Sequence, residues 1–274
     1  MIYELEPDEF ERTRPVFASL DYHLAINSII KGLTPAGIFV DDPEIPRTAF
    51  TWFKGKALLA GCSGNEAFND DLCTRLGETY YRALKKRGAT GFRLHYGPPI
   101  RETDIDTVFQ DPTRVEENRH YYHLDAGKQT WNATVPEGYE LKLVDSDLLS
   151  NKCLENLEDV VEEMQSERLK VRDFLSKSFG CVILQGREIV GWCMSEYNTD
   201  NRCELGIAAV EAYKRRGLAT LTAKATVRHA LDLGINEIGW HCSAENEASI
   251  ATAKKLGFSK KHDYKVYWIS LGHL

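Results

Sequence analysis

A basic, glycine-containing turn between an apolar stretch and an unbroken helical pattern most constrains the fold of this 274-residue chain. Residues 203–210 have the composition of a β-strand, whereas residues 218–233 are rich in Ala and Leu and contain no Gly or Pro. The segment therefore predicts a strand, a turn and a helix. A helix N-terminus exposes unpaired N–H groups and a partial positive charge. This arrangement predicts a binding site for a phosphate or diphosphate group.

The turn differs from the common phosphate-binding loops, because neither Gly-x-x-x-x-Gly-Lys-Ser/Thr nor Gly-x-Gly-x-x-Gly is present. Arg215 and Arg216 add full positive charges, and Gly217 allows the backbone to approach a ligand closely. The segment resembles the pyrophosphate loop of the GNAT superfamily of acyl-CoA N-acyltransferases. That pattern is Gln/Arg-x-x-Gly-x-Gly/Ala, and here it reads Lys214-x-x-Gly217-x-Ala219. The Lys in the first position departs from the family pattern.

A second block follows at the distance that the same family has. Residues 236–242 alternate apolar and polar positions, as expected of a strand. Asn246 then opens a helical segment that ends in Lys-Leu-Gly257-Phe, with Asn as a favourable N-cap and Gly as a favourable C′ residue. This block also resembles GNAT proteins, and the resemblance covers roughly residues 137–274. It implies an α+β fold, in which helices flank a mixed, mostly antiparallel central sheet.

The first 130 residues have a similar order of elements without the loop pattern. Strands are expected near residues 37–41, 48–53 and 91–96, with a helix over residues 70–86. We therefore expect an N-terminal α/β domain, residues 1–130, that is a degenerate GNAT-like half without a cofactor site. The GNAT acetyltransferase domain is expected at residues 137–274. The polar stretch 127–136 is the candidate linker between the two.

The resemblance implies that the chain is an acetyl-CoA-dependent N-acetyltransferase that moves an acetyl group directly to a primary amine. It supports a small-molecule acceptor over a protein. Acetyl is the family default for the acyl group, and acetyl-CoA is the expected co-substrate. The family assigns cofactor contacts to Ile207, Ala208, Ala209, Val210, Arg215, Arg216, Gly217, Leu218, Ala219, Thr220, Asn246 and Ser249.

An alkyl amine has a pKa near ~10, so it arrives protonated at neutral pH and must lose a proton before it can attack. Glu204 is the first candidate for the base, because several GNAT enzymes have a Glu at the corresponding strand position. A one-residue change of register would instead point this side chain to the other face. The alternative interpretation is a glutamate at a strand end that faces solvent. The oxyanion partner in this family is usually backbone N–H, here within residues 208–210.

The group that protonates the leaving thiolate is where this chain departs from the family. The common pattern has a Tyr seven residues after the Asn, and that position is Ala253 here. Tyr264 is the candidate acid by location, with Tyr267 and Cys242 as further options; His241 is interpreted as structural. In having this Ala and a long N-terminal domain, the chain resembles a GNAT subgroup that includes zwittermicin-type resistance acetyltransferases.

An acidic stripe accompanies the apolar positions of the helix expected in the region that lines the acceptor side of GNAT active sites. A wall of carboxylates would suit a cationic amine. The alternative is a solvated helix face with no role in binding. The stripe consists of Glu155, Glu158, Asp159, Glu162 and Glu163.

Composition sets the remaining bounds. A net charge of −7 and a pI of about 5.7 argue against nucleic acid as a partner. No apolar run reaches membrane-spanning length, and the start of the chain lacks a signal-peptide pattern, so neither a membrane partner nor a secreted location is expected. Seven cysteines without a Cys-x-x-Cys pair predict no metal site and no disulfide framework. We expect a reduced, cytoplasmic protein, with a homodimer as one option.

Two other functions stay open at this point. The missing Tyr at position 253 and the Lys at position 214 are compatible with a non-catalytic acyl-CoA-binding or regulatory module. Acetylation of a protein amine is the third hypothesis, and it would need a shallow open groove for its substrate.

Overall fold

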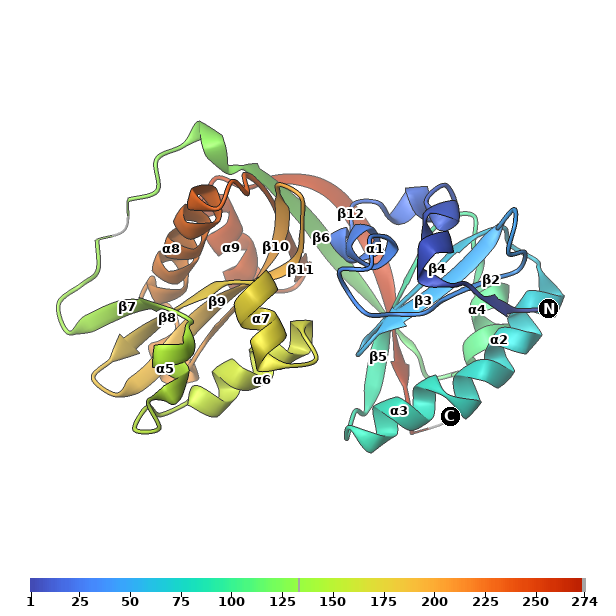
Figure 1. The fold of residues 1–274 in the computed structure, drawn as a ribbon, viewed down its shortest axis with the longest axis horizontal. Helices are drawn as coiled ribbons and strands as arrows, with labels where there is room; N and C mark the ends of the chain where they lie inside the picture. The colour runs from blue at the N-terminus through green and yellow to red at the C-terminus, as the bar shows by residue number, and fades with distance from the viewer. Residues whose placement is uncertain (133, 273–274) are drawn as a thin grey trace. The chain divides into compact units, whose positions relative to one another are not determined.

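The computed structural model describes residues 1–132 and 134–272, apart from the side chains of residues 166 and 167. The chain forms two compact units, which we describe separately (Figure 1). Unit 1 consists of Met1–Arg119 and Asp263–Leu274, and unit 2 consists of His120–His262. None of the helices among the described residues is both long and apolar enough to span a bilayer.

Unit 1 is a sheet with helices on both faces, in the strand order β1-β2-β3-β4-β5-β12. One apolar cluster joins the sheet to η1, η2 and α1, and another joins its other face to α2, α3 and α4. The elements are β1 (Tyr3–Glu4), η1 (Pro7–Thr13), η2 (Val16–Leu20), α1 (Leu24–Ile30), β2 (Ile38–Val40), β3 (Thr48–Phe53), β4 (Lys56–Gly61), α2 (Glu66–Glu78), α3 (Tyr80–Lys86), β5 (Gly91–Tyr96) and α4 (Glu102–Phe109).

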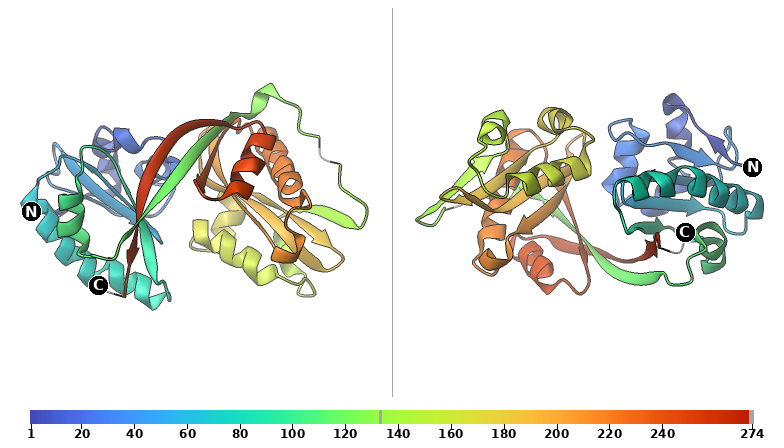
Figure 2. Two further views of the ribbon diagram at one scale, coloured as in Figure 1. Left: turned by 180° about the vertical axis from the view of Figure 1, so that it is seen from behind. Right: turned by 90° about the horizontal axis from the view of Figure 1, so that it is seen from below.

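Unit 2 has the same layered design, with the strand order β6-β11-β10-β9-β8-β7. Helices α8 and α9 cover one face, and α5, α6 and α7 cover the other (Figures 1 and 2). The elements are β6 (Val115–Asp125), η3 (Ala126–Lys128), β7 (Tyr139–Leu143), α5 (Ser146–Ser150), α6 (Leu157–Glu167), α7 (Val171–Lys177), β8 (Gly180–Gln185), β9 (Glu188–Thr199), β10 (Arg202–Ala209), η4 (Glu211–Tyr213), α8 (Leu218–Asp232), β11 (Glu237–Ser243) and α9 (Glu247–Lys255). The chain then returns to unit 1 through β12 (Ser259–Ser270).

The two halves of the chain repeat one topology. In each, three antiparallel pairings are followed by one parallel pairing, β4 with β5 in unit 1 and β10 with β11 in unit 2. The last strand of each half is exchanged, because β12 pairs with β5 and β6 pairs with β11. The expected mixed fold, a sheet flanked by helices, is therefore confirmed. That the first half is a degenerate copy without a cofactor site stays a prediction.

The predicted domain ranges 1–130 and 137–274 stay a prediction about folding units. The compact units differ from them in two places, since residues 120–130 belong to unit 2 and residues 263–270 of β12 complete the sheet of unit 1. Within the candidate linker 127–136, Trp131 is buried in the core of unit 2, and its indole Nε1 donates to the Ala126 carbonyl at 2.9 Å. Residue 133 of that linker lies outside the described residues.

The helix expected over residues 70–86 is wrong in its extent. Helix α2 begins earlier, because the side chain of Asn65 accepts a hydrogen bond from Phe68 N at 3.2 Å and caps it. The helix then breaks at Thr79, whose φ of −121° and ψ of −69° are not helical. The Thr79 hydroxyl donates to the Arg75 carbonyl at 2.6 Å, a local bond that competes with the helical pattern.

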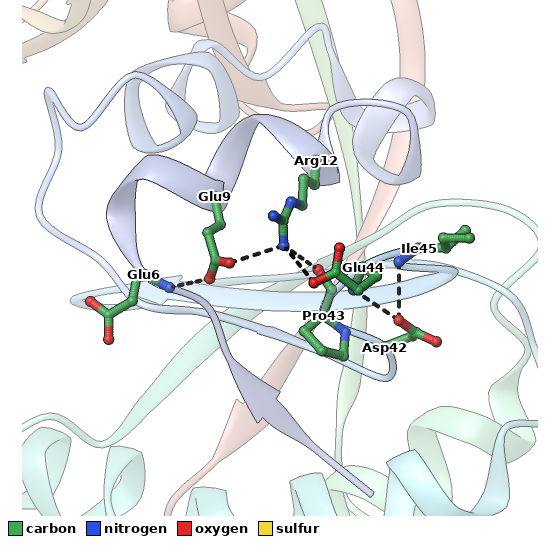
Figure 3. Close-up of polar contacts among 7 residues, drawn as sticks. All are labelled: Glu6, Glu9, Arg12, Asp42, Pro43, Glu44 and Ile45. Atoms are coloured by element: carbon green, nitrogen blue, oxygen red, sulfur yellow. Dashed lines mark hydrogen bonds and ion pairs between the residues drawn. The ribbon is translucent and has the colours of Figure 1, made fainter.

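The turn between β2 and β3 is fastened to η1 by one arginine (Figure 3). Arg12 Nη1 donates to Glu9 Oε1 at 2.9 Å and to the Pro43 carbonyl at 2.8 Å. Asp42 Oδ1 accepts from the backbone N–H groups of residues 44 and 45, and these bonds hold the pKa of Asp42 below its usual value. These bonds define the local structure of an exposed corner of unit 1.

Candidate active site

The two parallel strands of unit 2 separate part of the way along their length. Over the described residues, β10 pairs with β11 only from Arg202 to Glu204, opposite Glu237 to Gly239, although both strands continue beyond. Past Glu204, β10 pairs on its other side alone, with β9. Backbone N–H and C=O groups that leave a ladder are available to an outside partner. The separation therefore offers residues 205–209 as a strand edge within the sheet.

Unit 1 differs from unit 2 at the corresponding place. There β4 and β5 pair from Lys56 to Leu59, opposite Arg93 to Tyr96, and Gly97 N extends the ladder by donating to the Leu59 carbonyl at 3.1 Å. The strands stay together up to the loop that leads into α2. This contrast favours unit 2 as the half of the molecule that binds a ligand.

The loop after β4 is filled by a carboxylate of the protein itself. Asp104 on α4 is buried, and its Oδ1 accepts from Gly64 N at 2.8 Å and from Asn69 Nδ2 at 3.0 Å. Its Oδ2 accepts from Arg101 N at 3.0 Å and from the Ser63 hydroxyl. Burial alone would raise the pKa of Asp104, but these hydrogen bonds outweigh it and lower the pKa. An anion thus already occupies the loop that corresponds to the phosphate loop of unit 2.

We expect Asp104→Asn to destabilise unit 1 by about 2 kcal/mol, because it removes a charged acceptor from four donors. Since folding lowers the pKa of Asp104, its contribution is present above the unfolded-state pKa and is lost as pH falls through the folded-state pKa. Urea unfolding at neutral and at acidic pH measures both effects. The difference between wild type and variant should shrink in acid, and a constant difference would contradict this account.

In unit 2 the loop before α8 is held in place by side-chain contacts with β9 and within the loop itself. The Tyr213 hydroxyl donates to Glu188 Oε2 at 2.6 Å, a bond that raises the pKa of Tyr213. The guanidinium carbon of Arg216 lies 5.0 Å from the centre of the Tyr213 ring. Lys214 Nζ forms an ion pair with Glu211 at 2.5 Å, so the loop's first basic side chain is engaged locally. These contacts orient the loop ahead of the helix.

The start of α8 meets the requirements for an anion. Gly217 is the N-cap residue with φ of 79°, and no heavy atom lies within 4 Å of the position that its Cβ would take. Arg215 also has positive φ, at 62°, and both arginines are exposed. Helix α8 runs for 15 residues, and the first N–H groups of such a helix have no partner within it. The residues here fit a diphosphate group, which is what coenzyme A would bring.

The other predicted cofactor residues lie around this loop and on α9. Residues 207–210 are half-buried at the end of β10, and Val210 N donates to the Val190 carbonyl at 3.0 Å. Asn246 caps α9 by accepting from Ser249 N at 3.0 Å, and the Ser249 hydroxyl accepts from Trp240 Nε1 at 3.0 Å. The side chains of Asn246 and Ser249 therefore already hold α9 and β11 in place. Leu218 and Thr220 are buried and Ala219 is half-buried in the first turn of α8.

Glu204 lies where β10 and β11 part, and it is buried, with 3% of its surface exposed. Its Oε1 is 3.3 Å from His241 Nε2, on the next strand. Gly239 leaves room for this arrangement, because a Cβ there would lie 3.0 Å from Glu204 Cγ and 3.2 Å from the Tyr121 ring. The interpretation of Glu204 as a solvent-facing strand-end residue is wrong for this structure.

Two more carboxylates approach the same face of the sheet. A Cβ at Gly206 would lie 2.2 Å from Glu196 Oε1 and 3.3 Å from Glu163 Oε1. Glu196 is directly opposite Glu204 in the β9–β10 ladder, and Glu163 belongs to α6. Burial raises the pKa of Glu163, and the charge of Glu162 adds to this, while the indole of Trp192 opposes it. Carboxylates from three elements thus gather on the α6 face of the sheet.

The acidic stripe expected on this helix is mostly solvated. Of its five members only Glu163 is half-buried, and the other four are exposed. The apolar side of α6 consists of Leu157, Val160 and Met164, which pack on Trp192 and Met194. The interpretation as a solvated helix face therefore holds for four of the five positions. A role in binding stays possible only for Glu163.

The candidate acids lie in different surroundings. Tyr264 belongs to unit 1, where its hydroxyl accepts from Arg119 Nε at 3.2 Å and its ring lies 5.0 Å from that of His23. Tyr267, also in unit 1, donates to Glu102 at 3.1 Å, and burial raises its pKa to about 12. Cys242 is buried in the core of unit 2, as is Ala253. A role for Tyr264 in proton donation stays a prediction.

Sequence reasoning set His241 aside and missed Glu196 and Tyr121. A signal existed for Glu196, because it continues the alternation of Trp192 and Met194 directly after the apolar run of residues 189–194. None existed for Tyr121, which reaches this site only because β6 is exchanged between the halves. Among the described residues no group of three or more His, Cys, Asp or Glu side chains could hold a metal ion.

Comparisons with known proteins agree with this geometry. The uncharacterized N-acetyltransferase YdfB of Bacillus subtilis (strain 168) is 27% identical over 270 residues, which cover 98% of each chain. A GCN5-related N-acetyltransferase-like protein from Streptococcus suis 89/1591 has a TM-score of 0.68 at 23% identity, with 95% of this chain and 98% of that chain covered. A tandem GNAT protein from the clavulanic acid biosynthesis pathway has a TM-score of 0.58 at 10% identity, with 98% of each chain covered. These two structures share the fold.

A family model described as GNAT acetyltransferase matches residues 14–267, which is nearly the whole chain and includes both repeated halves. The parted strands and the basic loop at the head of a long helix lie inside that match. This protein belongs to the GNAT acetyltransferase family and is an acetyltransferase.

Proposed function

We propose that this acetyltransferase moves an acetyl group from acetyl-CoA to a primary amine of a small molecule. The single observation that carries the proposal is the position of Glu204, a buried carboxylate at the point where β10 and β11 separate. The separated strand edge would bind the acyl-pantetheine arm through backbone groups, and the start of α8 would bind the diphosphate. In this arrangement the proposed proton acceptor would lie beside the expected position of the thioester.

The acceptor side supports an ammonium group. Glu163 and Glu196 lie over Gly206, two residues beyond Glu204 on β10. A carboxylate that faces another across neighbouring strands is unfavourable by itself, and a cationic ligand between the two would relieve the repulsion. Glu204 would then take the proton from the ammonium group, which frees the nitrogen lone pair to attack. The backbone N–H groups of residues 208 and 209 are the proposed oxyanion donors, since the N–H of Val210, the third candidate, already donates to the Val190 carbonyl.

The test is release of free CoA from acetyl-CoA in the presence of a panel of primary amines of different length and charge. We expect turnover with at least one small amine and none with protein substrates. Tight binding of acetyl-CoA without turnover on any amine would refute the proposal and favour a non-catalytic acyl-CoA-binding module. Acetylation of peptides alone would refute the small-molecule acceptor.

Glu196→Gln should raise KM for the amine about tenfold and change kcat little, since it removes an attraction to the bound ammonium group in ground and transition state alike. Glu162→Gln is the matched control, because it removes the same charge from an exposed position of α6. Steady-state kinetics at low and high salt measure both variants. Equal KM values for the two variants would contradict a direct role of Glu196.

A further inference from the structure

We propose that His241 carries the proton away from Glu204 and holds the Glu204 carboxylate in place. This inference rests on the proposed function of Glu204 as the proton acceptor. His241 acts through Glu204, so it is a positioning residue for the reaction.

The geometry of the pair is well defined. His241 Nε2 lies 3.3 Å from Glu204 Oε1, and the side chain of His241 is 12% exposed against 4% for that of Glu204. The ring of Tyr121 stacks on the imidazole, with centroids 4.7 Å apart and planes 24° from parallel. The imidazole is therefore fixed on one side by a carboxylate and on one face by an aromatic ring.

The proton balance of the reaction requires a route by which one proton leaves the site. An ammonium group and acetyl-CoA yield an amide and the CoA thiol, and one proton is left over in each turnover. The nitrogen loses two protons, of which one ends on the sulfur of the leaving thiolate and the other must reach solvent. Glu204 can accept that second proton, but its burial keeps it from water. A neutral imidazole 3.3 Å away can take the proton from the protonated Glu204 and pass a proton on to solvent, since its side chain is the more exposed of the two.

Several titratable groups surround the imidazole. Glu204 faces it from β10, and Glu196 on β9 lies opposite Glu204. Tyr121 on β6 covers its face, and His262 on β12 stacks on the far side of Tyr121 at 6.1 Å. Of these groups, Glu204 is the one within hydrogen-bonding distance of the imidazole, at 3.3 Å.

The first test needs no turnover. The imidazole ¹⁵N resonances of His241 are compared by NMR at one pH in the wild type and in Glu204→Gln. We expect the Nε2 resonance of His241 to shift in Glu204→Gln, since the carboxylate 3.3 Å from it is replaced by an amide. An unchanged resonance would overturn the contact between the two residues.

The second test uses the pH dependence of kcat with an amine that the wild type accepts. His241→Gln keeps a hydrogen-bonding group but cannot carry a proton, so kcat at neutral pH should fall about tenfold or more, and the acid limb should move to lower pH. His262→Gln is the matched control and should leave the profile unchanged. Added imidazole should restore part of the activity of His241→Ala.

The outcomes separate the two proposals. If the wild type turns over an amine and His241→Gln has the same kcat and pH profile, the relay is wrong and the proposed function stands. If the wild type turns over no amine, the proposed function fails, and the relay fails with it whatever the NMR comparison shows.

Discussion

Glu204→Gln should lower kcat for amine acetylation by about 10²–10⁴-fold while the affinity for acetyl-CoA stays the same. The estimate is the usual effect of removing a group that transfers a proton in the transition state. The amide has the size of the carboxylate and can still bond to His241, so the packing over Gly239 is kept. What the variant loses is the ability to accept a proton from the ammonium group.

The measurement is kcat across pH together with the Kd of acetyl-CoA from calorimetry. The loss should diminish as pH rises toward the pKa of the free amine, near ~10, because more of the amine then arrives deprotonated. Glu196→Gln serves as a comparison, since it removes the neighbouring carboxylate and should affect KM more than kcat. A loss of Glu204→Gln activity that is the same at every pH would argue for a structural role instead.

The sequence predicted those parts of the site that are local in the chain. The strand, turn and helix around Gly217 have strong local signals, and Glu204 was a candidate through the resemblance to GNAT enzymes that have a Glu at this strand position. The convergence of Glu163 and Glu196 over Gly206 depends on how α6 packs and on the register of β9. Neither is determined by local pattern, because periodicity gives the face of an element and not its neighbour.

The exchanged strands were beyond sequence reasoning for a related reason. In the sequence β6 and β12 each follow the other elements of their own half, yet β12 pairs with β5 and β6 pairs with β11. The exchange nevertheless brings Tyr121 to His241 in unit 2, and Tyr264 to His23 in unit 1. Similarly, Asp104 fills the loop of unit 1 by bonding to Gly64, 40 positions earlier in the chain. The sequence shows only that this half lacks the loop motif, and not which side chain takes its place.

A valine at Gly217 should raise the Kd of acetyl-CoA by about 10–100-fold. The φ of 79° at this position costs a residue with a side chain about 1–2 kcal/mol, which favours a different loop conformation. Apart from the residues next to it in the chain, no described heavy atom lies within 4 Å of a Cβ there, so the new side chain would extend into the space where the diphosphate is expected. Gly234 at the other end of α8 is a matched control, with φ of 80° and the same open surroundings.

Because both glycines have the same backbone conformation, Gly217→Val and Gly234→Val should lower the thermal stability by similar amounts. Only Gly217→Val should weaken the binding of acetyl-CoA, since only the N-terminal end of α8 presents unpaired N–H groups and partial positive charge to the diphosphate. Calorimetric titration of both variants with CoA and with pantetheine separates binding at the loop before α8 from binding at the strand edge of β10. Pantetheine lacks the diphosphate, so its affinity should be the same in both. If the two variants bind CoA equally well, the diphosphate is held elsewhere, and the location of the active site in unit 2 must be abandoned.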